Sequence, residues 1–87
     1  QHDVGPAELG GTNLANANLA RAKLSGVVAM KADFTDAIMT NCKLVRANLR
    51  NANFQGANLD HADMSGADLS GANLQGAIMI AAVLNQT

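Results

Sequence analysis

The chain has 87 residues, of which 15% are charged, and a formal net charge of −1. Its length limits it to one small domain, and its near-neutral balance disfavours both a strong pull toward nucleic acid and an acidic surface that imitates nucleic acid. A single Cys cannot form an internal disulfide, so the cysteine count leaves the compartment open. No transmembrane or targeting segment is visible, which indicates a soluble chain. Because the chain begins with Gln1, we expect a processed protein or an excised segment.

After a lead-in at residues 1–6, a five-residue repeat fills residues 7–86 as one domain of sixteen units in unbroken register. In most units an Ala lies two residues before a large apolar residue, which we call the centre of the unit. Asn or Asp commonly lies between the two, and six of the eight Gly lie two residues after a centre. The centres are Leu9, Leu14, Leu19, Leu24, Ala29, Phe34, Met39, Leu44, Leu49, Phe54, Leu59, Met64, Leu69, Leu74, Met79 and Leu84.

A period of five fits neither an α-helix nor a single strand. On a helix, successive centres would rotate by about 140° and spread around the axis. On a strand, an odd step would place successive centres on opposite faces. A chain that bends once in every unit keeps all centres inside, and Gly, Asn, Ser and Asp suit the bends. The period therefore predicts a solenoid, although it does not fix the number of units in each coil.

The pattern in Ala47-Asn48-Leu49 and Ala67-Asp68-Leu69 resembles the pentapeptide repeat family, and this resemblance covers about nine-tenths of the chain. It implies an all-β fold, a right-handed quadrilateral parallel β-helix with four units in each coil, and hence about four coils. The family is abundant in cyanobacteria, and most of its members have no defined activity. The resemblance also implies that each Ala and each centre point inward.

With twenty residues in each coil, residues 20 apart become neighbours in a column, so Phe34 should stack on Phe54. Ala29 should leave a hole that Val27, in the usual Ala position, fills. Cys42 should be a small buried residue with an inert thiol. The predicted core is Leu14, Leu19, Leu24, Phe34, Met39, Leu44, Leu49, Phe54, Leu59, Met64, Leu69 and Leu74.

The sequence carries no recognisable catalytic, cofactor-binding or metal-binding constellation, and we expect no enzyme and no cofactor. His61 is flanked by Asp60 and Asp63, but these residues fall on different sides of a predicted corner, which favours a solvated corner over a metal site. The Gly residues recur as turn formers and not as a phosphate-binding loop.

Departures from the repeat mark the candidate partner surface. All six basic residues lie within residues 21–50, and the columns place Lys23 beside Lys43. Like charges this close are unfavourable, so the pair is either well solvated or serves an acidic partner. Apolar residues in outward positions are the other candidates. The candidate residues are Lys23, Lys43, Arg46, Arg50, Val28, Met30, Ile78, Ile80 and Val83.

We interpret the chain as a non-enzymatic structural or protein-interaction scaffold whose partner is unknown. We expect a protein partner or self-association through the C-terminal coil, with no nucleic acid and no membrane insertion. One alternative is a DNA-mimic inhibitor of type II topoisomerase, a class that the family includes, although the near-neutral charge and the length argue against it. A further alternative is an anion-binding face at Lys23 and Lys43.

Overall fold

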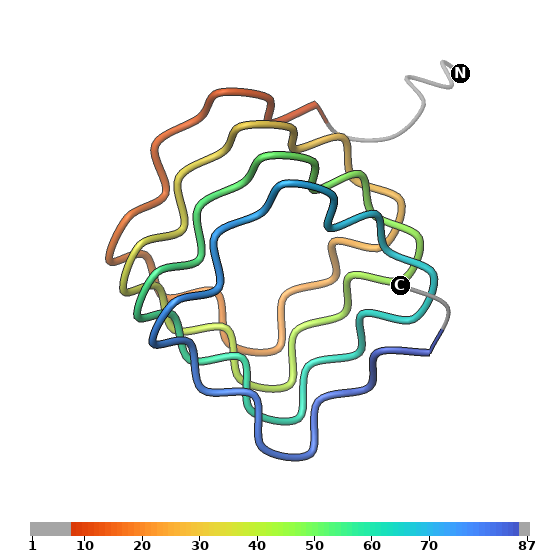
Figure 1. Ribbon diagram of the computed structural model, residues 1–87. Coiled ribbons are helices and arrows are strands. Elements are labelled where there is room, and N and C mark those ends of the chain that lie inside the picture. The colour runs from red at the N-terminus through yellow and green to blue at the C-terminus, as the bar shows by residue number, and fades with distance from the viewer. Residues whose placement is uncertain (1–7, 86–87) are drawn as a thin grey trace, which may run out of the picture.

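A computed structural model describes residues 8–85; the lead-in at 1–6, Ala7 and residues 86–87 lie outside the described part. Within it the chain forms isolated parallel bridges, each between residues 20 apart, from Glu8↔Val28 to Asp63↔Val83. A turn follows every bridge residue. Four units therefore complete one coil, as the resemblance predicts, and the coils stack with the same outline from the N-terminal end to the C-terminal end (Figure 1). Residues 8–85 contain no helix, and so none that could cross a membrane.

Each coil is joined to the next by backbone hydrogen bonds on every side. Around Asp33, for example, Leu14 N–H donates to the Asp33 carbonyl at 2.7 Å, and Asp33 N–H donates back to the Thr12 carbonyl at 2.9 Å. A third bond runs from Asn16 N–H to the Thr35 carbonyl at 2.8 Å. Because the same set recurs in successive units, the backbone of an inner coil is satisfied on both sides.

The corners are β-turns with a left-handed residue at the third position. Ala37 N–H donates to the Phe34 carbonyl at 3.0 Å, and Asp36 has φ 56°. This geometry is that of a type II turn, in which Gly or Asn is cheapest. Gly71 shows a second reason for glycine, since a Cβ there would collide with the Asn51 side chain of the preceding coil.

The Asn or Asp before the centre closes a second, side-chain turn. In nine units its Oδ1 accepts a hydrogen bond from the N–H two residues later, as Asn53 does from Gln55 at 3.0 Å. That N–H takes no part in the bonds between coils. The repeat therefore favours Asn and Asp because their short side chains satisfy this donor locally.

The core fills the inner coils and becomes partly exposed at the two ends. Seven predicted core residues are fully buried: Phe34, Met39, Leu44, Leu49, Phe54, Leu59 and Met64. Phe34 and Phe54 stack with ring centroids 4.8 Å apart and an interplanar angle of 3°, which confirms the column prediction. The five other predicted core residues are partly buried and pack against this core: Leu14, Leu19, Leu24, Leu69 and Leu74. They lie in the first and last coils, which have a neighbouring coil on one side only.

The two irregular inward positions behave as the sequence indicates. Val27 and Ala29 are both buried in the core, and no pocket is found in the part of the chain that the structure describes. Cys42 is fully buried, and burial raises the pKa of its thiol to about 11. The thiol therefore stays protonated and unreactive at neutral pH.

Candidate functional site

The candidate surface residues lie in three different places on the outside of the coils. Lys23, Lys43, Asp63 and Val83 form one column of consecutive bridges, and Val28 and Asn48 belong to another. Ile78 belongs to a third column. The structure therefore does not bring the nine candidate residues together in one site.

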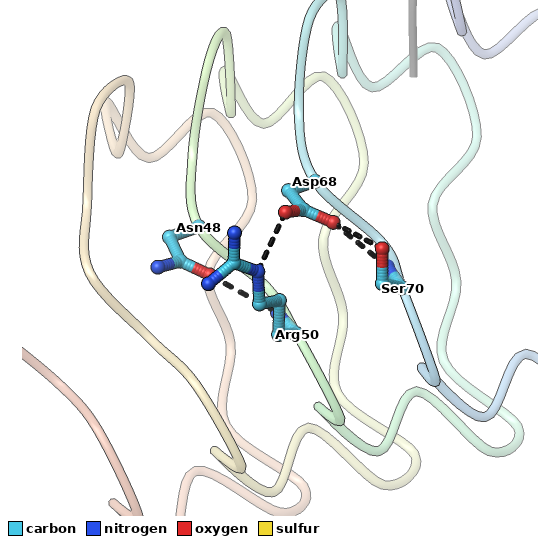
Figure 2. A network of polar contacts seen from close by, with 4 residues as sticks. All are labelled: Asn48, Arg50, Asp68 and Ser70. Atoms are coloured by element: carbon cyan, nitrogen blue, oxygen red, sulfur yellow. Dashed lines mark hydrogen bonds and ion pairs between the residues drawn. The ribbon is translucent and has the colours of Figure 1, made fainter.

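Arg50 is already engaged within the chain. Its Nε lies 2.7 Å from Oδ2 of Asp68 in the next coil (Figure 2). Oδ1 of the same carboxylate accepts bonds from the Ser70 hydroxyl at 2.6 Å and the Ser70 N–H at 3.0 Å. The two Ser70 bonds, followed by Arg50, lower the pKa of Asp68 to about 2. Asp68 thus holds Arg50 on this side of the coil, which weakens Arg50 as a partner residue. The sequence-based columns paired only residues 20 apart and missed this contact at a separation of 18.

The other basic candidates form a group without ion pairs. We define the basic face as Arg21, Lys23, Lys43 and Arg46, all of which are exposed. Lys23 and Lys43 are bridge partners in adjacent coils, as predicted. Within residues 8–85, no carboxylate lies within ion-pair distance of any of the four. Arg21 and Arg46 occupy left-handed corners, with φ 63° and 59°, that border the two lysines along the chain.

One carboxylate borders the basic face but is occupied by its own turn. Asp63, the bridge partner of Lys43, accepts the Ser65 hydroxyl at 2.7 Å and the Ser65 N–H at 3.1 Å. These two bonds lower the pKa of Asp63 most, and the charge of Lys43 contributes the least. Asp63 therefore remains ionised without forming an ion pair with Lys43.

The outward apolar residues of the last coil form a second group. We define the apolar rim as Ile78, Ile80 and Val83, which are 46%, 71% and 38% exposed. Between Ile80 and Val83 the corner residue Ala81 has φ 60°, an uncommon conformation for alanine. The sequence prediction missed Ile38, which is 45% exposed in the same column as Ile78, two coils away. Its signal was visible, since Ile38 replaces the Asn or Asp of the repeat.

The remaining candidates, Val28 and Met30, lie two residues apart on the side of the solenoid that also carries Arg50. Met30 is 39% exposed and Val28 is half-buried. His61 Nδ1 lies 3.0 Å from Oδ1 of Asp60. Among residues 8–85, no three side chains of His, Cys, Asp or Glu come together as a metal site would require.

The family profile that matches this chain is that of the pentapeptide repeats, with eight copies over residues 7–44 and 47–86. This chain belongs to the pentapeptide repeat family. A sequence search of curated proteins finds no match.

Solved structures of pentapeptide repeat proteins have the same fold. A thylakoid-lumen pentapeptide repeat protein of Arabidopsis thaliana is 24% identical with a TM-score of 0.79, over 92% of this chain and 59% of that one. HetL of the cyanobacterium Nostoc sp., a pentapeptide repeat protein involved in regulating heterocyst differentiation, is 27% identical with a TM-score of 0.55, over 88% and 40%. A further Nostoc pentapeptide repeat protein is 30% identical with a TM-score of 0.51, over 83% and 64%. This chain thus spans between 40% and 64% of these relatives.

Proposed function

We propose that this chain is a non-enzymatic protein-interaction scaffold, built as a right-handed quadrilateral β-helix, whose outward departures from the Asn/Asp pattern make its contacts. The observation that carries this proposal is that some outward residues lose a local hydrogen bond that Asn or Asp would form, and so lower the stability of the fold. Where Ile38, Ile78 or Lys23 replaces Asn or Asp, the N–H two residues later has no side-chain acceptor within residues 8–85. The replacing side chain is exposed in each case, so it does not return that stability by packing in the core.

For the apolar rim we propose a second copy of this chain as the partner. The three rim residues are apolar and exposed at positions where the repeat usually carries polar residues. The rim residues occupy outward positions of the repeat, so a further coil added to the stack would leave these positions on the outside. A lateral contact with a like coil would bury apolar surface on both partners.

The mass of the 87-residue chain in solution tests this proposal, measured by sedimentation from micromolar to millimolar protein. We expect the average mass to rise with concentration from the 8.9 kDa of one chain. Ile80→Asp should remain monomeric, because a charge at the rim must be desolvated on association. Met30→Asp, an equivalent change at an exposed apolar residue outside the rim, should associate like the unchanged chain. A chain that stays monomeric throughout, or an Ile80→Asp variant that still associates, would refute this assignment.

The alternative of a DNA-mimic topoisomerase inhibitor gains no specific support from the structure. A surface that imitates DNA requires a continuous run of negative charge. Here the side of the coil that carries Asp63 also carries Lys23 and Lys43 in the same column. A supercoiling assay with purified gyrase remains the direct test, and we expect no inhibition at micromolar protein.

A further inference from the structure

We infer that the basic face binds an acidic polypeptide segment, with Arg21 and Arg46 on either side of the stacked Lys23 and Lys43. This inference rests on the proposed protein-interaction function but uses residues other than those of the apolar rim, of which Val83 lies in the same bridge column two coils beyond Lys43. Four of the six basic residues of the chain gather there, and Asp63 is the acidic residue of their bridge column. Asp63 stays ionised and offsets part of this charge, but it forms no ion pair with Lys43, so four basic residues against one acidic residue leave the face positive.

Each of the four basic residues carries a local cost. The two lysines are bridge partners on strands about 4.8 Å apart, and like charges on directly opposite residues are unfavourable. Lys23 also gives up the side-chain turn that Asn or Asp forms in nine other units, since Ser25 N–H has no acceptor within residues 8–85. A positive φ makes arginine a costly choice at both corners. The repulsion between the stacked lysines and the lost side-chain turn at Lys23 both fall on this side of the coil, and neither stabilises the fold.

The arrangement also selects the kind of partner. An extended peptide presents alternate side chains on one side, about 6.6–7 Å apart, and could therefore reach from the stacked lysines to Arg21, at the corner two residues before Lys23. Arginine can bind a carboxylate in a bidentate geometry, so Arg21 and Arg46 could each hold a carboxylate of the peptide at the borders of the face. Gly66 leaves room for this at Arg46, because a Cβ at Gly66 would lie 3.2 Å from Arg46 Cγ.

Nucleic acid fits the same face less well. Single-stranded nucleic acid needs aromatic side chains on which bases can stack. The chain has no Trp or Tyr, and both Phe residues are fully buried. Four cations also supply few of the phosphate contacts on which duplex binding depends. We therefore choose an acidic polypeptide over a nucleic acid.

The test measures binding of a fluorescent oligoglutamate peptide by anisotropy at an ionic strength of about 0.1 M, where exposed charges more than about 10 Å apart are largely screened. The full chain should bind it, oligoglutamine of equal length should not bind, and added salt should weaken the complex. Lys43→Glu should weaken binding about fivefold to tenfold, because it removes one attraction and adds one repulsion. Lys31→Glu makes the same charge change at an exposed corner outside the basic face and should alter binding less than about twofold.

Equal losses in Lys43→Glu and Lys31→Glu would overturn the inference, since net charge alone would then explain binding. Tighter binding of a labelled single-stranded oligonucleotide of equal charge would overturn it in favour of nucleic acid, and absence of peptide binding would overturn it outright. Circular dichroism of both variants confirms that they are folded. Repeating the titration in the Ile80→Asp background separates the two proposals, because failure of rim association leaves peptide binding intact.

Discussion

The inside and the outside of the same coils follow the repeat with different strictness. Inside, each inner coil carries inward residues that are all buried, and the two aromatic rings stack in register. Outside, the position before the centre holds Asn or Asp in some units and Lys, Ile or Val in others. Strictness inside reflects packing, since an inward residue contacts the coils above and below. Outward residues can vary with a smaller loss of folding stability than inward residues, so binding residues are expected on the outside.

The largest expected loss of stability comes from truncating a buried side chain in an inner coil. Leu49→Ala should lower the free energy of unfolding by about 2–5 kcal/mol, because it removes a fully buried side chain and leaves a cavity. Urea denaturation measures this change. Leu14→Ala, at a centre of the first coil, should cost about 1–2 kcal/mol because Leu14 is only partly buried. Equal costs would contradict the distinction between inner and end coils.

A second prediction concerns the turn at Ala81. Ala81→Gly should raise the free energy of unfolding by about 0.5–1 kcal/mol, because glycine adopts a φ of 60° without the steric cost that alanine has. The matched change Ala52→Gly, at a buried inward position, should instead lower stability by at least about 0.5 kcal/mol. The two variants share one chemical change, so thermal melting of both isolates the effect of backbone conformation. A destabilised Ala81→Gly variant would be inconsistent with strain at that corner.

A smaller effect appears in the pH dependence of stability. The pKa of Asp68 is about 2, below its ordinary value of 3.8, and the pKa values of Asp33 and Asp63 are lowered in the same direction. A carboxylate whose pKa is depressed by folding contributes stability above its unfolded pKa and loses it as pH falls through its folded pKa. The free energy of unfolding should therefore decline between about pH 5 and pH 2. Denaturation at several pH values checks this, and Asp68→Asn should make the decline shallower. An unchanged slope in that variant would show that Asp68 makes no such contribution.

Much of the inside could be predicted from the sequence because an unbroken period determines which residues become neighbours. The buried Cys42 follows from its inward place in the period, whereas the stacking of Phe34 on Phe54 follows from the period together with four units in each coil. The number of units in a coil came from the family resemblance, since a period of five does not set the bend angle.

The outside could be predicted only in part. Columns identify bridge partners such as Lys23 and Lys43, but they do not show where a long side chain reaches. The columns therefore predict that Arg50 is available for a partner, whereas its side chain forms an ion pair with Asp68 in the next coil. Ile38 lies outside the predicted partner surface although it replaces the Asn or Asp of the repeat, because no second outward apolar residue stands beside it in the sequence.

The central distinction between inside and outside is tested most directly by one stability measurement on a variant with the outward pattern restored. In the combined variant Lys23→Asn, Ile78→Asn, Ile80→Ser, each Asn can accept the N–H two residues later, as Asn53 does from Gln55. We expect the free energy of unfolding in urea to equal or exceed that of the original chain, by up to about 1–2 kcal/mol. A loss of more than about 1 kcal/mol would show that these outward residues stabilise the fold, and would contradict their assignment to binding.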